Sequence, residues 1–341
     1  MNTKTLLLSA GLALGMLGSA QAQTLKIATI APEGSAWMED MRAGASEIEQ
    51  RTGGRVNVKF YGGGVQGNDK QVQRKMRTGQ LNGGAFTSGG MAQFQKDARL
   101  YDMPLAFNNV EEVQYVRAEL DAVLRQRLED AGYVNFGFAG GGFAYMMSNQ
   151  PLASLKDLEG QKVWTPEGDP VAYAALSALG VAPVTMPLTD VMTGLQTDLL
   201  NSVTVPPVGA VVLQWHTRLK FITELPVAYV YAGILIDKKA FGRLSPGDQA
   251  VVREVFEAVY QKFDANGIVD NEKAMQALLD SGLQRVAPVT SQVTTWREKV
   301  AASNLKQAQS GAVDLALLMQ LRGLLQEYRN SVETTTAATS Y

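Results

Sequence analysis

The sequence predicts an α/β fold in two domains, and three observations support this prediction. From residue 25 to residue 87 the patterns follow the order strand, helix, strand, helix, strand, which is typical of parallel strands joined by helical crossovers. A second series of strand and helix patterns begins near Ser148, with no linker before it. The helical pattern from Ser245 to Leu279 is far longer than an average helix of about 11 residues.

The first 22 residues have the organisation of a secretory signal peptide. Lys4 gives a positive start, and Leu6–Leu17 is an apolar run too short to cross a bilayer. Ala20-Gln21-Ala22 fits the small-residue rule for cleavage. We therefore expect export to the periplasm with cleavage after about Ala22. An uncleaved anchor helix is the alternative interpretation.

The first series opens with Leu25–Ala31, an alternating run that predicts a strand and is interrupted by Pro32. Ser35 is the expected N-cap of a helix that continues through Ile48. A second alternating run, Arg55–Tyr61, predicts the next strand.

Asp69 is the expected cap of a second helix, which reaches Thr78, and Leu81–Thr87 predicts the third strand. Glu111–Ala131 has the pattern of an exposed amphipathic helix, and Tyr133–Ala139 that of a further strand. The glycine cluster after this strand lacks the Lys-Ser/Thr ending of a phosphate loop, which favours a flexible turn beside a cleft.

The second series contains short elements. Lys162–Thr165 predicts a strand, Asp169 precedes the helix Val171–Leu179, Ala182–Met186 predicts another strand, and Val191–Asp198 another helix. The remaining patterns indicate one buried strand and three helices, at 228–237, 245–279, 298–310 and 313–331.

Composition excludes several classes of function. The chain has 341 residues, of which 46% are apolar, enough for one large or two medium cores. A net charge of −2 does not suggest a nucleic-acid binder, which would present a basic face. Without Cys there are no disulfides, thiol nucleophiles or thiolate metal sites. His216 is the only histidine and has no nucleophile motif near it, so we expect no catalytic residues, no metal and no cofactor.

Several short motifs resemble one family. The sequence is similar to the extracytoplasmic receptors of TRAP transporters, of the DctP type, over most of the chain after the signal peptide. The resemblance rests on Arg51–Val56 (RTGGRV), Tyr61–Gly67, Tyr101–Phe107, Ser148–Leu152, Asp157–Pro166 and Leu195-Gln196-Thr197.

The resemblance implies a two-domain periplasmic solute-binding fold with mixed sheets, hinge crossovers and one long helix, 245–279, that bridges both domains. The expected division is a signal peptide at 1–22, domain I at 23–141 plus about 230–265, domain II at 142–229 plus about 266–331, and a disordered tail at 332–341. It also implies a monomeric receptor that closes on a small organic ligand and delivers it to the membrane subunits of a TRAP transporter.

The departures from the family fall in its ligand site. The family's usual arginine, which holds a ligand carboxylate, is Trp164 here, and a second arginine of some members aligns with Ala144. Acidic and amide positions of the family become Thr204 and Val205. Trp offers one N–H and an apolar face where Arg offers two charge-assisted hydrogen bonds. Burying a carboxylate without its cation is costly.

The sequence therefore predicts a ligand that is not an ordinary C4-dicarboxylate. An apolar, aromatic or lipid-like molecule suits the altered residues better, and a cation stacked on Trp164 is a further alternative. Another arginine, such as Arg99 or Arg218, could restore anion binding. The candidate substrate-binding residues are Trp164, Ala144, Phe143, Tyr145, Thr204, Val205, Gln66, Thr87 and Trp37.

Three classes of function remain open at this point. A transport receptor is the first, and a ligand-sensing or orphan envelope receptor shares its fold and its closure. A periplasmic enzyme on the same scaffold is the third, and the shortage of His, Cys and catalytic motifs argues against it.

Overall fold

The computed structural model of the chain describes residues 22–339, with side chains as far as residue 334. The expected signal peptide lies outside the described residues, except for Ala22. No helix among the described residues is both long enough and apolar enough to cross a membrane.

One large mixed sheet organises the molecule. Its eight strands follow the order β2-β1-β3-β9-β5-β8, with β4 and β10 also pairing with β9. Strands β1, β2 and β3 are parallel, as the alternation of strands and helices predicts, whereas β9 is antiparallel to β3, β4 and β5. The strands are β1 (Gln23–Thr29), β2 (Val56–Tyr61), β3 (Gly83–Thr87), β4 (Tyr133–Asn135), β5 (Ala139–Ser148), β8 (Ser202–Val205), β9 (Phe221–Asp237) and β10 (Gln284–Val286).

The helices of the first series begin where side chains can bond their free N–H groups. Ser35 caps α1 (Ala36–Arg51) by accepting a hydrogen bond from the Met38 amide at 3.3 Å. The cap of α2 (Asp69–Arg77) is Asn68 and not Asp69, because Asn68 and Gln71 form a reciprocal capping box. This corrects the predicted cap by one residue and leaves the Asp69 carboxylate free for other contacts.

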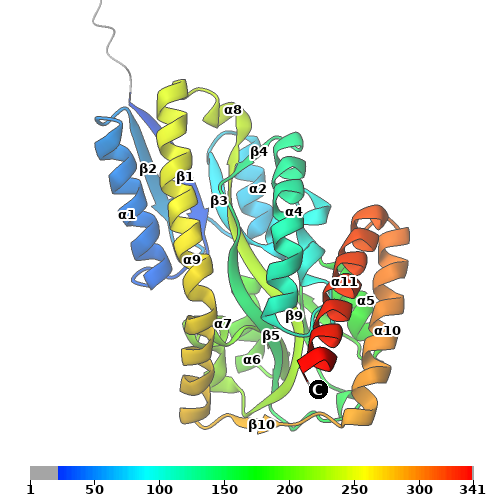
Figure 1. Cartoon of the computed structure of the whole chain (residues 1–341). Coiled ribbons are helices and arrows are strands. Elements are labelled where there is room, and N and C mark those ends of the chain that lie inside the picture. The colour runs from blue at the N-terminus through cyan, green and yellow to red at the C-terminus, as the bar shows by residue number, and fades with distance from the viewer. Residues whose placement is uncertain (1–21, 340–341) are drawn as a thin grey trace, which may run out of the picture.

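The glycine cluster 140–142 does not form a turn, because it lies within β5. The expected strand 133–139 is therefore two strands, β4 and β5, and the second continues to Ser148. A side chain at Gly140 would come within 2.0 Å of the Tyr229 hydroxyl on β9, so only glycine allows this approach. Figure 1 shows β5 and β9 running side by side along the length of the molecule.

A second, smaller sheet pairs β6 (Trp164–Pro166) with β7 (Val184–Met186) in parallel. Short helices surround it, and Asp169 starts the first of them by accepting from the Val171 and Ala172 amides. These helices are α5 (Pro170–Ala178), α6 (Val191–Gln196) and α7 (Pro207–Val212), with the 3₁₀ turns η2 (Lys156–Leu158), η3 (Leu188–Asp190) and η4 (Trp215–Arg218).

The long helix α9 (Pro246–Asp280) begins at its Ser245 cap, as predicted, and extends past both ends of the cavity described below. In Figure 1 it runs down one side of the molecule from the level of α1 to the level of α7. The remaining helices are α3 (Ser88–Met91), η1 (Lys96–Asp102), α4 (Val110–Asp130), α8 (Lys238–Phe241), α10 (Thr290–Gln309) and α11 (Leu315–Thr339).

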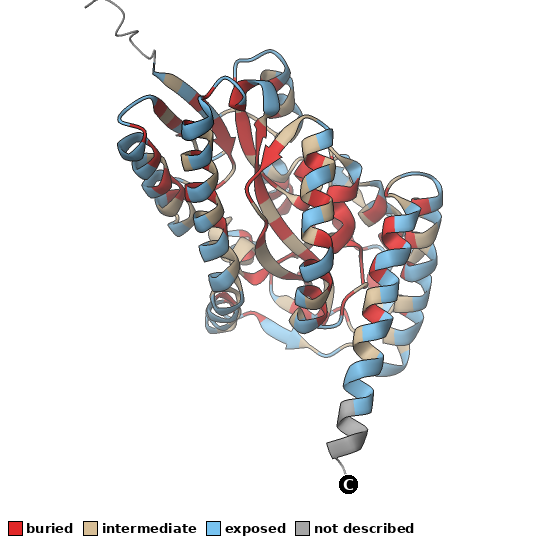
Figure 2. Cartoon of the chain, turned by 45° about the horizontal axis from the view of Figure 1, so that its top comes forward, coloured by how far each residue is buried: buried red, intermediate tan, exposed pale blue. Residues whose placement is uncertain are grey.

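The two C-terminal helices differ from the expectation in extent and position. The backbone of α11 is helical to Thr339, through most of the segment 332–341 that was expected to be a disordered tail. Leu317, Leu318 and Leu321 pack in the same cluster as α4, whereas Trp296 of α10 packs with α5. Figure 2 shows both helices burying one face and exposing the other.

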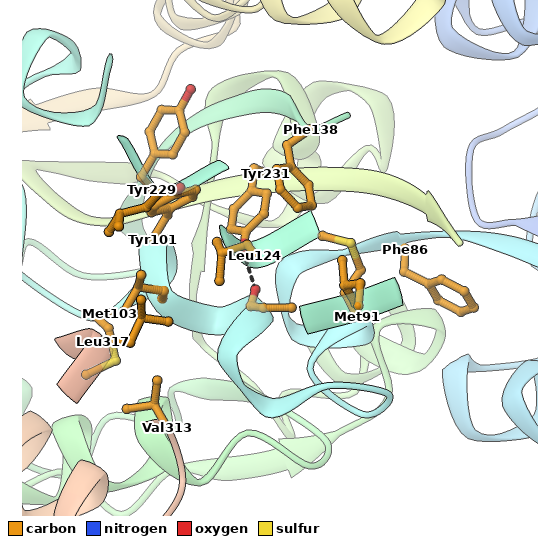
Figure 3. Packing of buried hydrophobic residues seen from close by; sticks show 14 of the residues in the cluster. Phe86, Met91, Tyr101, Met103, Leu124, Phe138, Tyr229, Tyr231, Val313 and Leu317 are labelled. Carbon is orange, nitrogen blue, oxygen red and sulfur yellow. Dashed lines mark hydrogen bonds between the residues drawn. The ribbon is translucent and has the colours of Figure 1, made fainter. Parts of the chain in front are cut away.

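Four clusters of buried apolar side chains hold the described part of the chain together. In the largest, shown in Figure 3, Tyr101 lies 5.1 Å from Tyr231 between ring centroids, and the Tyr231 hydroxyl donates to the Ala98 carbonyl. This bond satisfies a buried hydroxyl and fixes η1 against β9. Asp102, the last residue of η1, therefore has a defined position beside the cavity.

Candidate functional site

A cavity of about 290 Å³ lies where the large sheet faces the small one. This volume is at the lower end of the range usual for small-molecule sites, about 300–1,000 Å³. One wall comes from the carboxyl ends of β1 and β3, from the start of β5 and from the middle of β9. The opposite wall comes from β6, η3, β8, α7 and η4, and α9 closes one side.

The parallel strands explain part of this position. Their carboxyl ends meet at one edge of a sheet, where the loops that follow leave a crevice. At the end of β3, Thr87 caps the short helix α3 by accepting from the Gly90 amide at 3.4 Å. This bond orients the Thr87 hydroxyl toward its own helix at the cavity wall.

Trp164 lines the cavity, but its N–H group is already used. The indole Nε1 donates to the Met186 carbonyl at 3.0 Å, across the small sheet. The ring is 6% exposed and packs edge to face on Trp215, with centroids 5.4 Å apart. Trp164 therefore presents apolar surface to the cavity and no hydrogen-bond donor.

Arg99 does not line the cavity, and its guanidinium forms an ion pair with Asp169, which does. Its Nη1 lies 2.5 Å from Asp169 Oδ1, with side-chain exposures of 4% and 10%. The same Asp169 oxygen accepts the first amides of α5. Arg218 lies outside the lining of the cavity and is exposed. Neither arginine offers an unpaired charge to a ligand in this structure.

Two carboxyl groups at the cavity wall are perturbed by burial. Burial raises the pKa of Asp69 to about 6, and no hydrogen bond or ion pair of Asp69 offsets this among the described residues. Burial, with the nearby Asp169 charge, raises the pKa of Asp102 to about 8, although Arg99 and a Ser88 hydrogen bond act in the opposite direction. At neutral pH the Asp69 carboxyl is mostly ionised and that of Asp102 mostly protonated.

The structure brings five of the nine candidate binding residues to the cavity wall. They are Trp37, Thr87, Trp164, Thr204 and Val205. Gln66 lies at a smaller neighbouring cavity, where its side-chain oxygen accepts from Lys75 Nζ at 2.9 Å.

Phe143, Ala144 and Tyr145 do not line the cavity, although the sequence placed them there. The register of β5 against β9 shifts between Gly140 and Gly142 and again beyond Ala144, and the β5 residues that line the cavity are Ala139, Gly140 and Gly141. Phe143 instead packs edge to face on Tyr229 at 5.4 Å, and Ala144 is 1% exposed.

Several lining residues were not among the candidates. Asp69 and Asp102 are two of them, and their importance depends on burial, which the sequence does not display. Three more come from α9, namely Tyr260, Phe263 and Asn271. Their spacing of three and eight residues places them on one helix face, and this pattern could have identified them.

His216, the only histidine, does not line the cavity. Its Nδ1 lies 3.0 Å from the Ala210 carbonyl. Among residues 22–334, no group of three or more His, Cys, Asp or Glu side chains is placed to hold a metal ion.

Comparisons with known proteins agree with this geometry. Residues 27–310 match the family described as bacterial extracellular solute-binding protein, family 7. The C4-dicarboxylate-binding periplasmic protein DctP of Rhodobacter capsulatus is 27% identical over 259 residues, which cover 73% of this chain and 76% of that protein.

Solved structures share the fold. The sugar acid binding protein DctPAm of Advenella mimigardefordensis, in complex with galactonate, has a TM-score of 0.82 at 18% identity and covers 90% of this chain and 99% of its own. A TRAP periplasmic solute binding protein of Sulfurospirillum deleyianum with bound succinate has a TM-score of 0.80 at 15% identity, with coverages of 89% and 99%. At these identities the likeness concerns the fold alone.

Proposed function

Because this chain belongs to the bacterial extracellular solute-binding proteins of family 7, we propose that it is the periplasmic receptor of a TRAP-type transport system and that its ligand is not an ordinary C4-dicarboxylate. The family is one of transport receptors and not of enzymes, and the fold is that of two-domain solute-binding proteins. Export with cleavage after about Ala22, and delivery to membrane subunits, belong to this proposal.

The proposal about the ligand rests on one observation: both Trp164 and Arg99 already have partners within the protein. Trp164 stands where the related receptors are expected to have an arginine, and its N–H is bonded to Met186. Arg99 is neutralised by Asp169 and almost completely buried. The carboxylate of a ligand could bind Arg99 only by displacing Asp169. Breaking a buried ion pair costs about 3–5 kcal/mol.

The cavity is also placed for closure between two domains. Its lining comes from both parts of the expected division: Thr29, Thr87 and Tyr231 belong to domain I, and Trp164 and Thr204 to domain II. The strands β5 and β9 and the helix α9 pass from one part to the other, which supports a hinge at the start of β5 and at the middles of β9 and α9. Helix α11 contacts α4 of the expected domain I and also α10 of the expected domain II, so we propose that it joins both domains.

Isothermal titration calorimetry of the mature protein with succinate, malate and fumarate tests this proposal. We expect no binding tighter than about 1 mM, because among the described residues no unpaired cation lines the cavity. Micromolar binding of any of the three would contradict the proposal about the ligand. A ligand-sensing receptor shares the cavity, and co-purification with either TRAP membrane subunits or a membrane kinase separates the two functions.

A further inference from the structure

The described part of the cavity wall carries more acidic than basic side chains. One residue, Lys70, supplies a positive charge, and it pairs with Glu167 at 2.5 Å. A second carboxylate of the cavity wall, that of Asp169, is neutralised by Arg99. The carboxyl groups that line the cavity are Asp69, Asp102, Glu167, Asp169 and Asp270. Three of them, at positions 69, 102 and 270, have no ion-pair partner among the described residues.

Asp69 is a carboxylate at the cavity wall to which the described residues give no partner, and burial raises its pKa. It is partly buried, and no hydrogen bond or ion pair to it is present among residues 22–334. A side chain at Gly90 would come within 2.7 Å of Asp69 Oδ2, so glycine at this position leaves room for the carboxylate against α3. A buried charge without a partner is unfavourable, and a cation from the ligand would remove this cost.

Apolar ring surface lies around these carboxylates. Trp37, Trp164 and Trp215 line the cavity together with Tyr260 and Phe263 of α9. The faces of such rings attract ammonium and guanidinium groups and also accommodate the apolar body of a ligand. Carboxylates beside aromatic faces are the combination that suits a cation, whereas a carboxylate ligand would be repelled by the same charges.

We propose that the ligand carries a positively charged ammonium or amidinium group attached to an apolar or aromatic body, with Asp69 as its counter-ion and the tryptophan rings as its apolar wall. The volume of about 290 Å³ limits this ligand to a small molecule. This inference rests on the proposed receptor function, and it specifies the class of ligand for the same cavity.

Matched probes test the inference on the mature, ligand-free protein by calorimetry at pH 7.5. One series is 2-phenylethylamine, 2-phenylethanol and phenylacetate, and a second is butylamine, butanol and butyrate. We expect the amine to bind at least about 10-fold tighter than its alcohol in one or both series, and the carboxylate not to bind. Equal or tighter binding of a carboxylate, or no binding of either amine, would overturn the inference.

The Asp69→Asn variant identifies the counter-ion. It keeps the size of the side chain and removes the charge, so amine affinity should fall by about 10-fold while alcohol affinity stays within about 3-fold. Glu159→Gln removes one exposed carboxylate outside the cavity and is the matched control, expected to bind as the unmodified protein does. Unchanged amine binding by correctly folded Asp69→Asn would overturn the role of Asp69.

The two proposals fail in different ways. Tight binding of phenylethanol without preference for the amine would end the inference about charge but leave an apolar-ligand receptor in place. Micromolar succinate binding would end the proposal that the receptor does not take C4-dicarboxylates.

Discussion

Trp164 and Asp69 lie on the wall of the same cavity, and both favour a ligand without a negative charge. Trp164 stands where we expect related receptors to have an arginine, and its N–H bond to Met186 leaves only apolar surface. Asp69 adds a partly buried negative charge. At the scale of single residues, we therefore propose that the site disfavours a ligand carboxylate.

Restoring the arginine should restore carboxylate binding. In Trp164→Arg the guanidinium would lie at the cavity wall, and we expect succinate to bind with a Kd below about 1 mM where the unmodified protein shows no heat. The control is Trp164→Phe, which keeps a ring against Trp215 and loses the bond to Met186. It should lose about 1 kcal/mol of stability and gain no succinate binding. A folded Trp164→Arg protein that binds no mono- or dicarboxylate would count against Trp164 as the altered anchor.

The raised pKa of Asp69 predicts a pH-dependent effect on stability. Its folded-state pKa, about 6, lies above the ordinary value of 3.8, so the native protein holds this proton to higher pH than the unfolded chain does. Stability then falls as pH rises between these values. Asp69→Asn removes this loss, and we expect its melting temperature to exceed that of the unmodified protein at pH 7.5.

The same comparison at pH 4 provides the internal check, because Asp69 is then mostly protonated in the native state. The stabilisation by Asp69→Asn should be about 1–3 kcal/mol at pH 7.5 and close to zero at pH 4. The other charged or titratable acidic and basic side chains that line the cavity are unchanged in the variant: Lys70, Asp102, Glu167, Asp169 and Asp270. A destabilised variant at pH 7.5 would mean that the Asp69 charge has a favourable partner.

At the scale of elements, the close approach of α9 to β5 sets the shape of the cavity. A side chain at Gly267 would come within 2.3 Å of the Gly140 carbonyl oxygen. Next to this contact, Asn271 Nδ2 donates to the Gly141 carbonyl at 2.8 Å. Asp264 Oδ1 of α9 also accepts from the Gly140 amide at 2.8 Å. Helix and strand are therefore held together by backbone contact and side-chain hydrogen bonds, at the point where both pass the cavity.

Gly267→Ala tests this contact. The added methyl group must push α9 away from β5, so we expect a loss of about 1–3 kcal/mol in the free energy of unfolding, measured by denaturant titration. Gly323→Ala on α11 is the matched control, since a side chain there meets no atom within 4 Å. It should stabilise the protein by up to about 1 kcal/mol, as Gly to Ala does in an open helix. Equal effects of the two changes would contradict the close packing.

The elements that sequence predicted well are those with a clear period and a cap. Leu25–Ala31 and Arg55–Tyr61 alternate in polarity, and Ser245 precedes Pro246 at the start of α9, so strand and helix follow from local chemistry. The segment Ser202–Val212 was not resolved into β8 and α7, because its uniform apolar residues have no period and its two prolines obscure both elements.

The candidate site could be predicted only in part, because register shifts and burial leave no pattern in the sequence. Trp164, Thr204 and Val205 were found because they interrupt recognisable motifs. Phe143 and Tyr145 were misplaced because β5 contains register shifts that no periodic pattern reveals. Asp69 and Asp102 look like ordinary helix and loop residues, and only the packing around them makes their charge significant.

At the scale of the whole molecule, ion pairs join the two sides of the cavity. Lys70 of α2 reaches Glu167 beyond β6, and Arg99 of η1 reaches Asp169 at the start of α5. Both pairs connect the proposed domain I to the proposed domain II. An opening motion about the start of β5 and the middles of β9 and α9 would separate these partners, so the pairs favour the closed arrangement.

Lys70→Ala should shift the molecule toward the open arrangement. The pair is half-exposed and worth at most about 1 kcal/mol, so ligand affinity should fall by about 2- to 5-fold. Small-angle X-ray scattering of the ligand-free protein should give a larger radius of gyration. Lys262→Ala is the control, because Lys262 pairs with Asp40 within the proposed domain I. A compact Lys70→Ala protein with unchanged affinity would contradict a role of this pair in closure.

The most direct measurement is native mass spectrometry of the mature protein isolated from the periplasm, followed by release and identification of the bound molecule. The structure predicts a small passenger with an apolar or aromatic body and a positive charge, because Trp164 and Asp69 line its cavity and no unpaired cation does. A C4-dicarboxylate or sugar acid as the passenger would contradict the account and would require Asp169 to release Arg99.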